Sequence, residues 1–152
     1  MRIMIYRILH WIFRLALAGI FLYTGYIKLE APLQFAAILY GYKLFPDFLI
    51  LPMSNYFPWV EIGLGILLLI GWRIRYVALA ACGLLMSFTA ALTITYLRGI
   101  DANCGCFSFD DRIGLLTILR DSLILLPALY LAVEPVLRSR FSRQPAAEPA
   151  TP

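Results

Sequence analysis

The sequence predicts an all-α integral membrane protein, a four-helix bundle with an extra short interfacial helix in its first outward loop. Of its 152 residues, 62% are hydrophobic and only 14% are charged. A soluble domain of this length could not cover so much apolar surface with so few charges. The apolar residues fall in runs near twenty residues long, the length that crosses a bilayer core of about 30 Å. The net charge of +4 does not indicate a nucleic-acid partner, because the basic residues are scattered at predicted helix ends.

The first predicted span covers residues 8–27. The segment 16–18, Ala-Leu-Ala, imitates a signal-peptide cleavage site, but the apolar run continues well past it, which predicts a retained helix. Arg14 lies inside this span. We expect it to extend to the near interface beside Trp11, or to pair with Glu134 at the same end of the last span.

A long connection follows, over residues 28–58. Pro32 suits the first turn of a helix of about ten residues, which is too short to cross a membrane and predicts an interfacial segment. Pro46, Pro52 and Pro58 are expected to break anything longer. The short helix is expected either to form a lid or wall near the cysteine loop described below, or to serve only as an interfacial anchor.

The second span is predicted over residues 58–72 and the third over residues 76–97, joined by a basic turn at residues 73–75. Glu61 lies inside the second span. A carboxylate at this depth must face the bundle interior or a wet cavity, so Glu61 is a candidate functional residue. Cys82, near the basic turn, is expected to be a buried free cysteine that behaves as a small hydrophobe.

The fourth span is predicted over residues 112–133 and carries Arg120 and Asp121. Neighbours on one helix point about 100° apart, so we expect these two side chains to reach different partners. Glu61 is the expected mate of Arg120. Their pairing would either fix helix register or take part in proton or electron chemistry.

Residues 1–137 form the predicted membrane domain, and residues 138–152 a basic, then Pro/Ala-rich tail that we expect to be disordered. An even number of spans places both termini on one side. Basic residues concentrate at the termini and the middle turn, so the positive-inside rule predicts that these are cytoplasmic in a bacterial inner membrane. The loop between the third and fourth spans then faces the periplasm, where a disulfide can form and persist.

That loop contains the central motif, Cys104-Gly105-Cys106. Two residues of extended chain span roughly 6.6–7.2 Å, at or beyond the usual limit of about 6.8 Å between bridged Cα atoms. A disulfide here therefore needs a turned backbone, which Gly105 permits, and would be strained and exchangeable. Three interpretations remain: a redox-active dithiol, a structural disulfide in an accessory subunit of a larger membrane complex, and a relay for a soft ion such as Cu(I) or Hg(II).

A resident metal is not expected. A closed zinc site needs four ligands, and the single histidine, His10, belongs to the opposite membrane face. Asp101, Asp110 and Asp111 could complete only a mixed set of soft thiolates and hard carboxylates. No cofactor motif is evident either; a quinone in the bundle is possible, but no motif supports it.

Four short motifs follow one another along the chain. They are Gly19, Phe21, Gly25 and Lys28 in the first span, then Pro58-Trp59-Val60-Glu61, Asn103-Cys104-Gly105-Cys106-Phe107 and Leu119-Arg120-Asp121. This arrangement resembles the MauE/DoxX-like membrane proteins, and more closely the methylamine-utilisation MauE branch, over about residues 14–131. The family usually continues the Cys-Gly-Cys-Phe element with glycine, where this chain has Ser108.

The resemblance implies a four-helix membrane protein that supports thiol–disulfide chemistry in extracytoplasmic partner proteins. MauE proteins are associated with maturation of the methylamine dehydrogenase small subunit, a disulfide-rich periplasmic protein. By the resemblance, Cys104 and Cys106 would be the redox pair, set in a loop shaped by Gly105. The supporting polar residues would be Glu61, Arg120, Asp121 and Lys28. Continued turnover would need an electron source or sink, such as a quinone or another membrane subunit.

Overall fold

The computed structural model describes residues 2–107 and 110–141, and within them the chain is helical apart from short connections. Five α-helices follow one another: α1 (Arg2–Glu30), α2 (Pro32–Gly41), α3 (Asp47–Ile70), α4 (Ile74–Leu97) and α5 (Leu115–Phe141). Four of them, all except α2, are long and apolar enough to cross a membrane. The predicted all-α membrane bundle and its additional short helix are confirmed.

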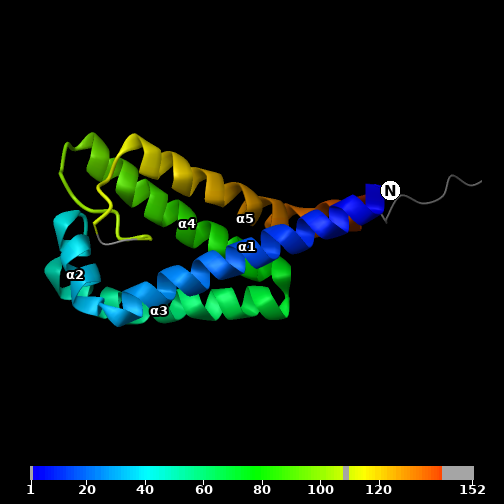
Figure 1. Ribbon diagram of the computed structural model, residues 1–152, viewed down its shortest axis with the longest axis horizontal. Helices are drawn as coiled ribbons and strands as arrows, with labels where there is room; N and C mark the ends of the chain where they lie inside the picture. The colour runs from blue at the N-terminus through cyan, green and yellow to red at the C-terminus, as the bar shows by residue number, and fades with distance from the viewer. Residues whose placement is uncertain (1, 108–109, 142–152) are drawn as a thin grey trace, which may run out of the picture.

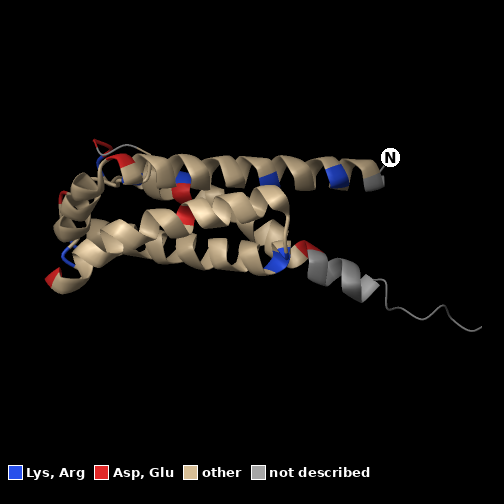
Figure 2. Cartoon of the chain, turned by 90° about the horizontal axis from the view of Figure 1, so that it is seen from below, with Lys and Arg blue, Asp and Glu red and all other residues tan. Residues whose placement is uncertain are grey.

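The long helices lie in two close pairs, α1 with α3 and α4 with α5 (Figure 1). The start of α1 and the end of α5 share one end of the bundle, called here the terminal end. At the other end, α2 lies beside the loop that joins α4 to α5, and we call this the cysteine end. Most charged residues lie toward these two ends, with only a few between the helices (Figure 2).

Helix α3 begins earlier than predicted. It starts at Asp47, directly after its N-cap Pro46, and not near residue 58. The prediction that prolines would break this segment is wrong for Pro52 and Pro58, which both lie inside the helix. Each proline removes one helical hydrogen bond, but a membrane-spanning helix tolerates this where neighbouring helices support its backbone.

Helix α1 packs closely against α3 at Pro58. A Cβ added at Gly25 would lie 3.0 Å from the carbonyl oxygen of Pro58 and 2.7 Å from Cγ1 of Ile62. The missing side chain therefore lets the two helices approach closely, as small residues do in membrane bundles. This contact brings Lys28, one turn further along α1, opposite Glu61 of α3.

Helix α1 is longer than predicted, running from Arg2 to Glu30 against a predicted span of residues 8–27. Helix α4 agrees with the third predicted span, and α5 begins slightly later than predicted and continues to Phe141. The first residues of the predicted tail thus belong to α5, and residues 142–152 lie outside the described part. Cys82 is buried in an apolar cluster with Val77, Ala78 and Ala81 of its own helix, as expected.

Large apolar side chains are exposed on the outer faces of the long helices, among them Ile70, Leu97 and Leu116. Contiguous apolar surface of this kind is uncommon on a soluble monomer and is suited to contact with lipid. The chain is therefore a multi-pass membrane protein with lipid-facing helices.

The guanidinium of Arg14 lies over the ring of Trp11, 4.4 Å from its centroid, and it also has partners that were not predicted. Its Nε donates a hydrogen bond to the carbonyl oxygen of Leu68 and its Nη2 to that of Leu69, both at 2.6 Å. The predicted pairing with Glu134 is wrong, because Glu134 contacts His10 at 2.7 Å. The last carbonyls of a helix lack partners within it, and a buried guanidinium at this end of α3 satisfies them.

Candidate functional site: a buried dithiol and carboxylate

The loop that carries the two cysteines folds back on itself. The backbone N–H of Cys104 donates to the carbonyl oxygen of Asp111 at 2.6 Å, and that of Ile113 donates to Ala102 at 3.0 Å. These bonds join the chain leaving α4 to the chain entering α5. They hold the cysteines against the beginning of α5.

Gly105 makes the turn between the cysteines. Its φ is +67°, in the left-handed region that glycine adopts without steric cost. A Cβ at this position would lie 2.9 Å from Cδ1 of Ile38 in α2. Gly105 therefore both turns the loop and lets α2 pack directly over it.

The short helix α2 forms a wall over the cysteines. Ile38 and Tyr42 belong to the same buried cluster as Cys104 and Cys106. The hydroxyl of Tyr42 donates to the carbonyl oxygen of Cys104 at 2.6 Å. Burial raises the pKa of Tyr42, so its phenol stays protonated and keeps this bond. The short helix therefore contacts the loop, as the predicted wall would.

Replacing Gly105 with alanine should destabilise the loop. The left-handed backbone costs roughly 1–2 kcal/mol for a residue with a Cβ, and Ile38 must also move. We expect a lower unfolding temperature in detergent and faster alkylation of Cys104 and Cys106. Gly99 is the matched control, because its φ is +66° but a Cβ there would meet no atom within 4 Å. Equal losses in the Gly99→Ala and Gly105→Ala variants would contradict a role for the Ile38 contact.

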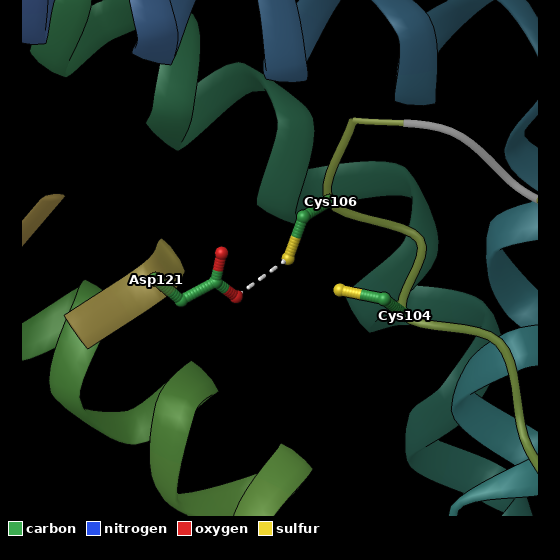
Figure 3. Close-up of side chains that lie close together, drawn as sticks. All are labelled: Cys104, Cys106 and Asp121. Carbon is green, nitrogen blue, oxygen red and sulfur yellow. Dashed lines mark hydrogen bonds between the residues drawn. The ribbon is translucent and has the colours of Figure 1, made fainter. Parts of the chain in front are cut away.

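The two thiols and one carboxylate converge beneath this wall (Figure 3). Cys104, Cys106 and Asp121 are 0%, 8% and 4% exposed, and their Sγ and carboxylate oxygen atoms lie within 4.8 Å of one another. The thiol of Cys106 donates to Oδ2 of Asp121 at 3.3 Å. A disulfide requires about 2.05 Å between the sulfur atoms, so the loop must tighten to form one.

Arg120 lies close to the thiol of Cys104 and to two carboxylates. Its Nη1 contacts Oδ2 of Asp111 at 3.1 Å, and its Nε contacts Oδ1 of Asp121 at 3.3 Å. Its Nη2 is 3.9 Å from Sγ of Cys104. The prediction that Arg120 pairs with Glu61 is therefore wrong. Arg120 and Asp121 contact each other, but they also reach different partners, Asp111 and Cys106, as expected. The arginine side chain is long enough to fold back along α5 toward the loop.

Glu61 pairs instead with Lys28 of α1. The Lys28 Nζ to Glu61 Oε1 distance is 2.6 Å, and the two side chains are 2% and 7% exposed. The rings of Phe35, Phe57 and Phe88 surround the ammonium group, with centroids 5.1, 5.4 and 5.3 Å from Nζ. The lysine was predicted only as a polar support, and nothing in its sequence spacing identifies this partner.

The surroundings give the two cysteines different acidities. Interaction with the neighbouring thiol of Cys106, helped by the charge of Arg120, lowers the pKa of Cys104 despite its burial and the opposing charge of Asp121. Burial, followed by the interaction with Cys104, raises the pKa of Cys106 well above its usual value. Cys104 is therefore the thiol that ionises more readily, and Cys106 the one that keeps its proton.

The same three side chains could also bind a metal ion. Within the described residues, the ligand atoms of Cys104, Cys106 and Asp121 are close enough to share one ion. Two soft thiolates and one hard carboxylate form a mixed set. Arg120 beside Cys104 also adds a positive charge that opposes a cation. The geometry therefore favours chemistry of the thiols themselves.

These features define a class: multi-pass α-helical membrane proteins with a buried dithiol and carboxylate at one end of the bundle. The family model described as methylamine utilisation protein MauE matches residues 6–134, which include all but the first two residues of the four spans, and the cysteine loop. The chain belongs to this family, and the predicted resemblance is confirmed.

Two relatives, both named methylamine utilization protein MauE, support the assignment. The chain is 32% identical to the one from Methylophilus methylotrophus over 123 residues, which cover 78% of this chain and 65% of the relative. It is 31% identical to the one from Paracoccus denitrificans over 144 residues, which cover 93% and 73%. The chain thus spans slightly less than two thirds of the Methylophilus protein. No solved structure matches it.

Proposed function

We propose that this chain is a membrane thiol–disulfide exchange protein in methylamine utilisation, and that Cys104 and Cys106 act on disulfides of extracytoplasmic partner proteins. One observation carries the proposal: the paired thiols have unlike neighbours, an arginine at Cys104 and a carboxylate that accepts the hydrogen bond of Cys106. A disulfide that serves only to connect the loop requires neither group.

In the first step, the thiolate of Cys104 attacks a disulfide of the partner. A bond forms between Sγ of Cys104 and one partner sulfur, the partner's S–S bond breaks, and the other sulfur leaves as a thiolate. Arg120 favours this step because its charge stabilises the attacking thiolate.

In the second step, Asp121 accepts the proton of Cys106, which then attacks Sγ of Cys104. The intramolecular disulfide forms, and the partner's remaining sulfur is released as a thiolate. The partner is reduced by two electrons and the chain is oxidised by two. The reverse sequence oxidises a partner dithiol. Continuous turnover requires a second redox partner, either another membrane protein or a quinone.

The proposed orientation follows from the distribution of charge. Arg7, Arg73 and Arg75 lie toward the terminal end, so the positive-inside rule puts that end in the cytoplasm of a bacterial inner membrane. The cysteine end then faces the periplasm, where partner disulfides occur.

The decisive experiment is the midpoint potential of the cysteine pair. Purified Cys82→Ser protein retains only these two thiols. It is equilibrated in glutathione or dithiothreitol buffers and alkylated, and its mass is then measured by mass spectrometry. A reversible midpoint between about −120 and −270 mV supports exchange. A disulfide that stays closed below about −300 mV would be a structural connection, and the accessory-subunit alternative would replace this proposal.

Replacing Arg120 with methionine should raise the pKa of Cys104, because a positive charge near its sulfur is lost. Alkylation of Cys104, followed by mass spectrometry across a pH series, should then reach its half-maximal rate at a higher pH. Arg120→Lys keeps the charge and should shift the profile less. An unchanged profile in Arg120→Met would show that the arginine does not activate this thiol.

A further inference from the structure

A partly open cavity of about 40 Å³ lies beside Cys106, among the long helices. The four long helices and the cysteine loop all contribute to its wall. One water needs about 10–15 Å³ of such space, so the cavity can hold roughly three or four waters. Its wall includes both Glu61 and Asp121, so it connects the Lys28–Glu61 ion pair with the dithiol site.

Two buried polar atoms in this wall have no hydrogen-bond partner among the described residues: Oε2 of Glu61 and Oγ1 of Thr89. The other carboxylate oxygen of Glu61 is held by Lys28. A buried polar atom without a partner costs on the order of 1–3 kcal/mol. The wall of the cavity is mostly apolar, but the two unpartnered atoms and the carboxylates of Glu61 and Asp121 give a bound water polar partners there. The cavity is therefore a candidate water site whose wall includes two carboxylates.

We propose that water in this cavity carries the proton of Cys106 from Asp121 to Glu61 during the second exchange step. The inference rests on the proposed function and assigns Glu61, Thr89 and Lys28 a part in it. The S–H bond of Cys106 breaks and its electron pair stays on sulfur. The proton moves to Oδ2 of Asp121, then through water to Oε2 of Glu61, which becomes a neutral carboxylic acid.

The charges on the surrounding elements favour this transfer. Lys28 of α1 faces Glu61. When Glu61 is neutral, the ammonium group of Lys28 is no longer balanced by that carboxylate. The ammonium group then stabilises the new thiolate of Cys106, because its positive charge acts to lower the pKa of that thiol against the larger effect of burial. Asp121 of α5 ends the step as a carboxylate, as it began. Helix α4 contributes the uncharged hydroxyl of Thr89.

The test separates the two steps in time. Reduced Cys82→Ser protein is mixed with 4,4′-dithiodipyridine, whose first thiopyridone is released by Cys104 and the second by Cys106. We expect Glu61→Gln to slow the second release by roughly 10²-fold, the lower range for positioned proton transfer, without a comparable loss in the first. Thr89→Val should slow it less, and Thr89→Ser should restore it.

The controls address folding. Glu61→Gln leaves Lys28 without its partner, so Lys28→Met/Glu61→Gln is tested as well, and its second release should be at least as slow. Ser87→Ala removes an exposed hydroxyl elsewhere on α4 and should leave both releases unchanged. A second release at the original rate in both Glu61 variants, or an equal slowing of both releases, would overturn the inference. If the unsubstituted pair gives no second release, the proposed exchange function itself fails.

Discussion

The Cys106→Ser variant should become a trap for the proteins on which this chain acts. Cys104 retains the arginine that favours its thiolate and should still attack a partner disulfide. Without the second thiol, the mixed disulfide cannot be resolved, so turnover should stop and the adduct should accumulate stoichiometrically. The adduct can be isolated from membranes under non-reducing conditions and its partner identified by mass spectrometry.

The complementary variant is Cys104→Ser. It removes the more acidic thiol, and we expect neither turnover nor a stable adduct. Both changes are made in the Cys82→Ser background, so that no third thiol contributes. An equal yield of adduct from Cys104→Ser and Cys106→Ser would reject the order of attack proposed here.

Replacing Lys28 with methionine should destabilise the bundle by about 3–5 kcal/mol. The loss leaves the Glu61 carboxylate buried between α1 and α3 without its cation, and removal of one partner of a buried pair typically costs this much. Replacing both residues, as in Lys28→Met/Glu61→Gln, should recover most of the loss because no buried charge remains. The free energy of unfolding can be measured by titrating detergent-solubilised protein with sodium dodecyl sulfate.

Tyr26→Phe is the matched control for this prediction. It removes an exposed hydrogen bond from Tyr26 to Glu30 on the same helix, and its effect should be small. If the double variant is as unstable as Lys28→Met, the aromatic rings around the ammonium group, and not the ion pair, make the larger contribution.

The sequence predicted the features that depend on local signals. Long apolar runs identified the membrane helices, and Pro32 identified the start of α2. Gly105 was expected to turn the cysteine loop, and it does so with a positive φ. Hydropathy and backbone preference are encoded in short segments, so they can be recognised without tertiary structure.

The sequence could not predict which polar residues would meet. The mistaken start of α3 near residue 58 placed Glu61 close to a helix end, although it lies well inside α3. Its partner depends on the close approach of α1 at Gly25, which brings Lys28 into contact. The hydrogen bond between Cys106 and Asp121 depends on how α5 is rotated about its axis. Such rotations are determined by contacts between distant segments, which hydropathy does not contain.

The hydrogen bonds of Arg14 have a consequence for where the molecule can open. They connect the first half of α1 to the last turn of α3. The ion pair of Lys28 and Glu61 connects the same two helices nearer the cysteine end. Fixed at two depths, α1 and α3 cannot slide past one another without breaking buried polar contacts at both. We therefore expect the movement that admits a partner to Cys104 to occur in α2 and the cysteine loop, with α1 and α3 as a stationary frame.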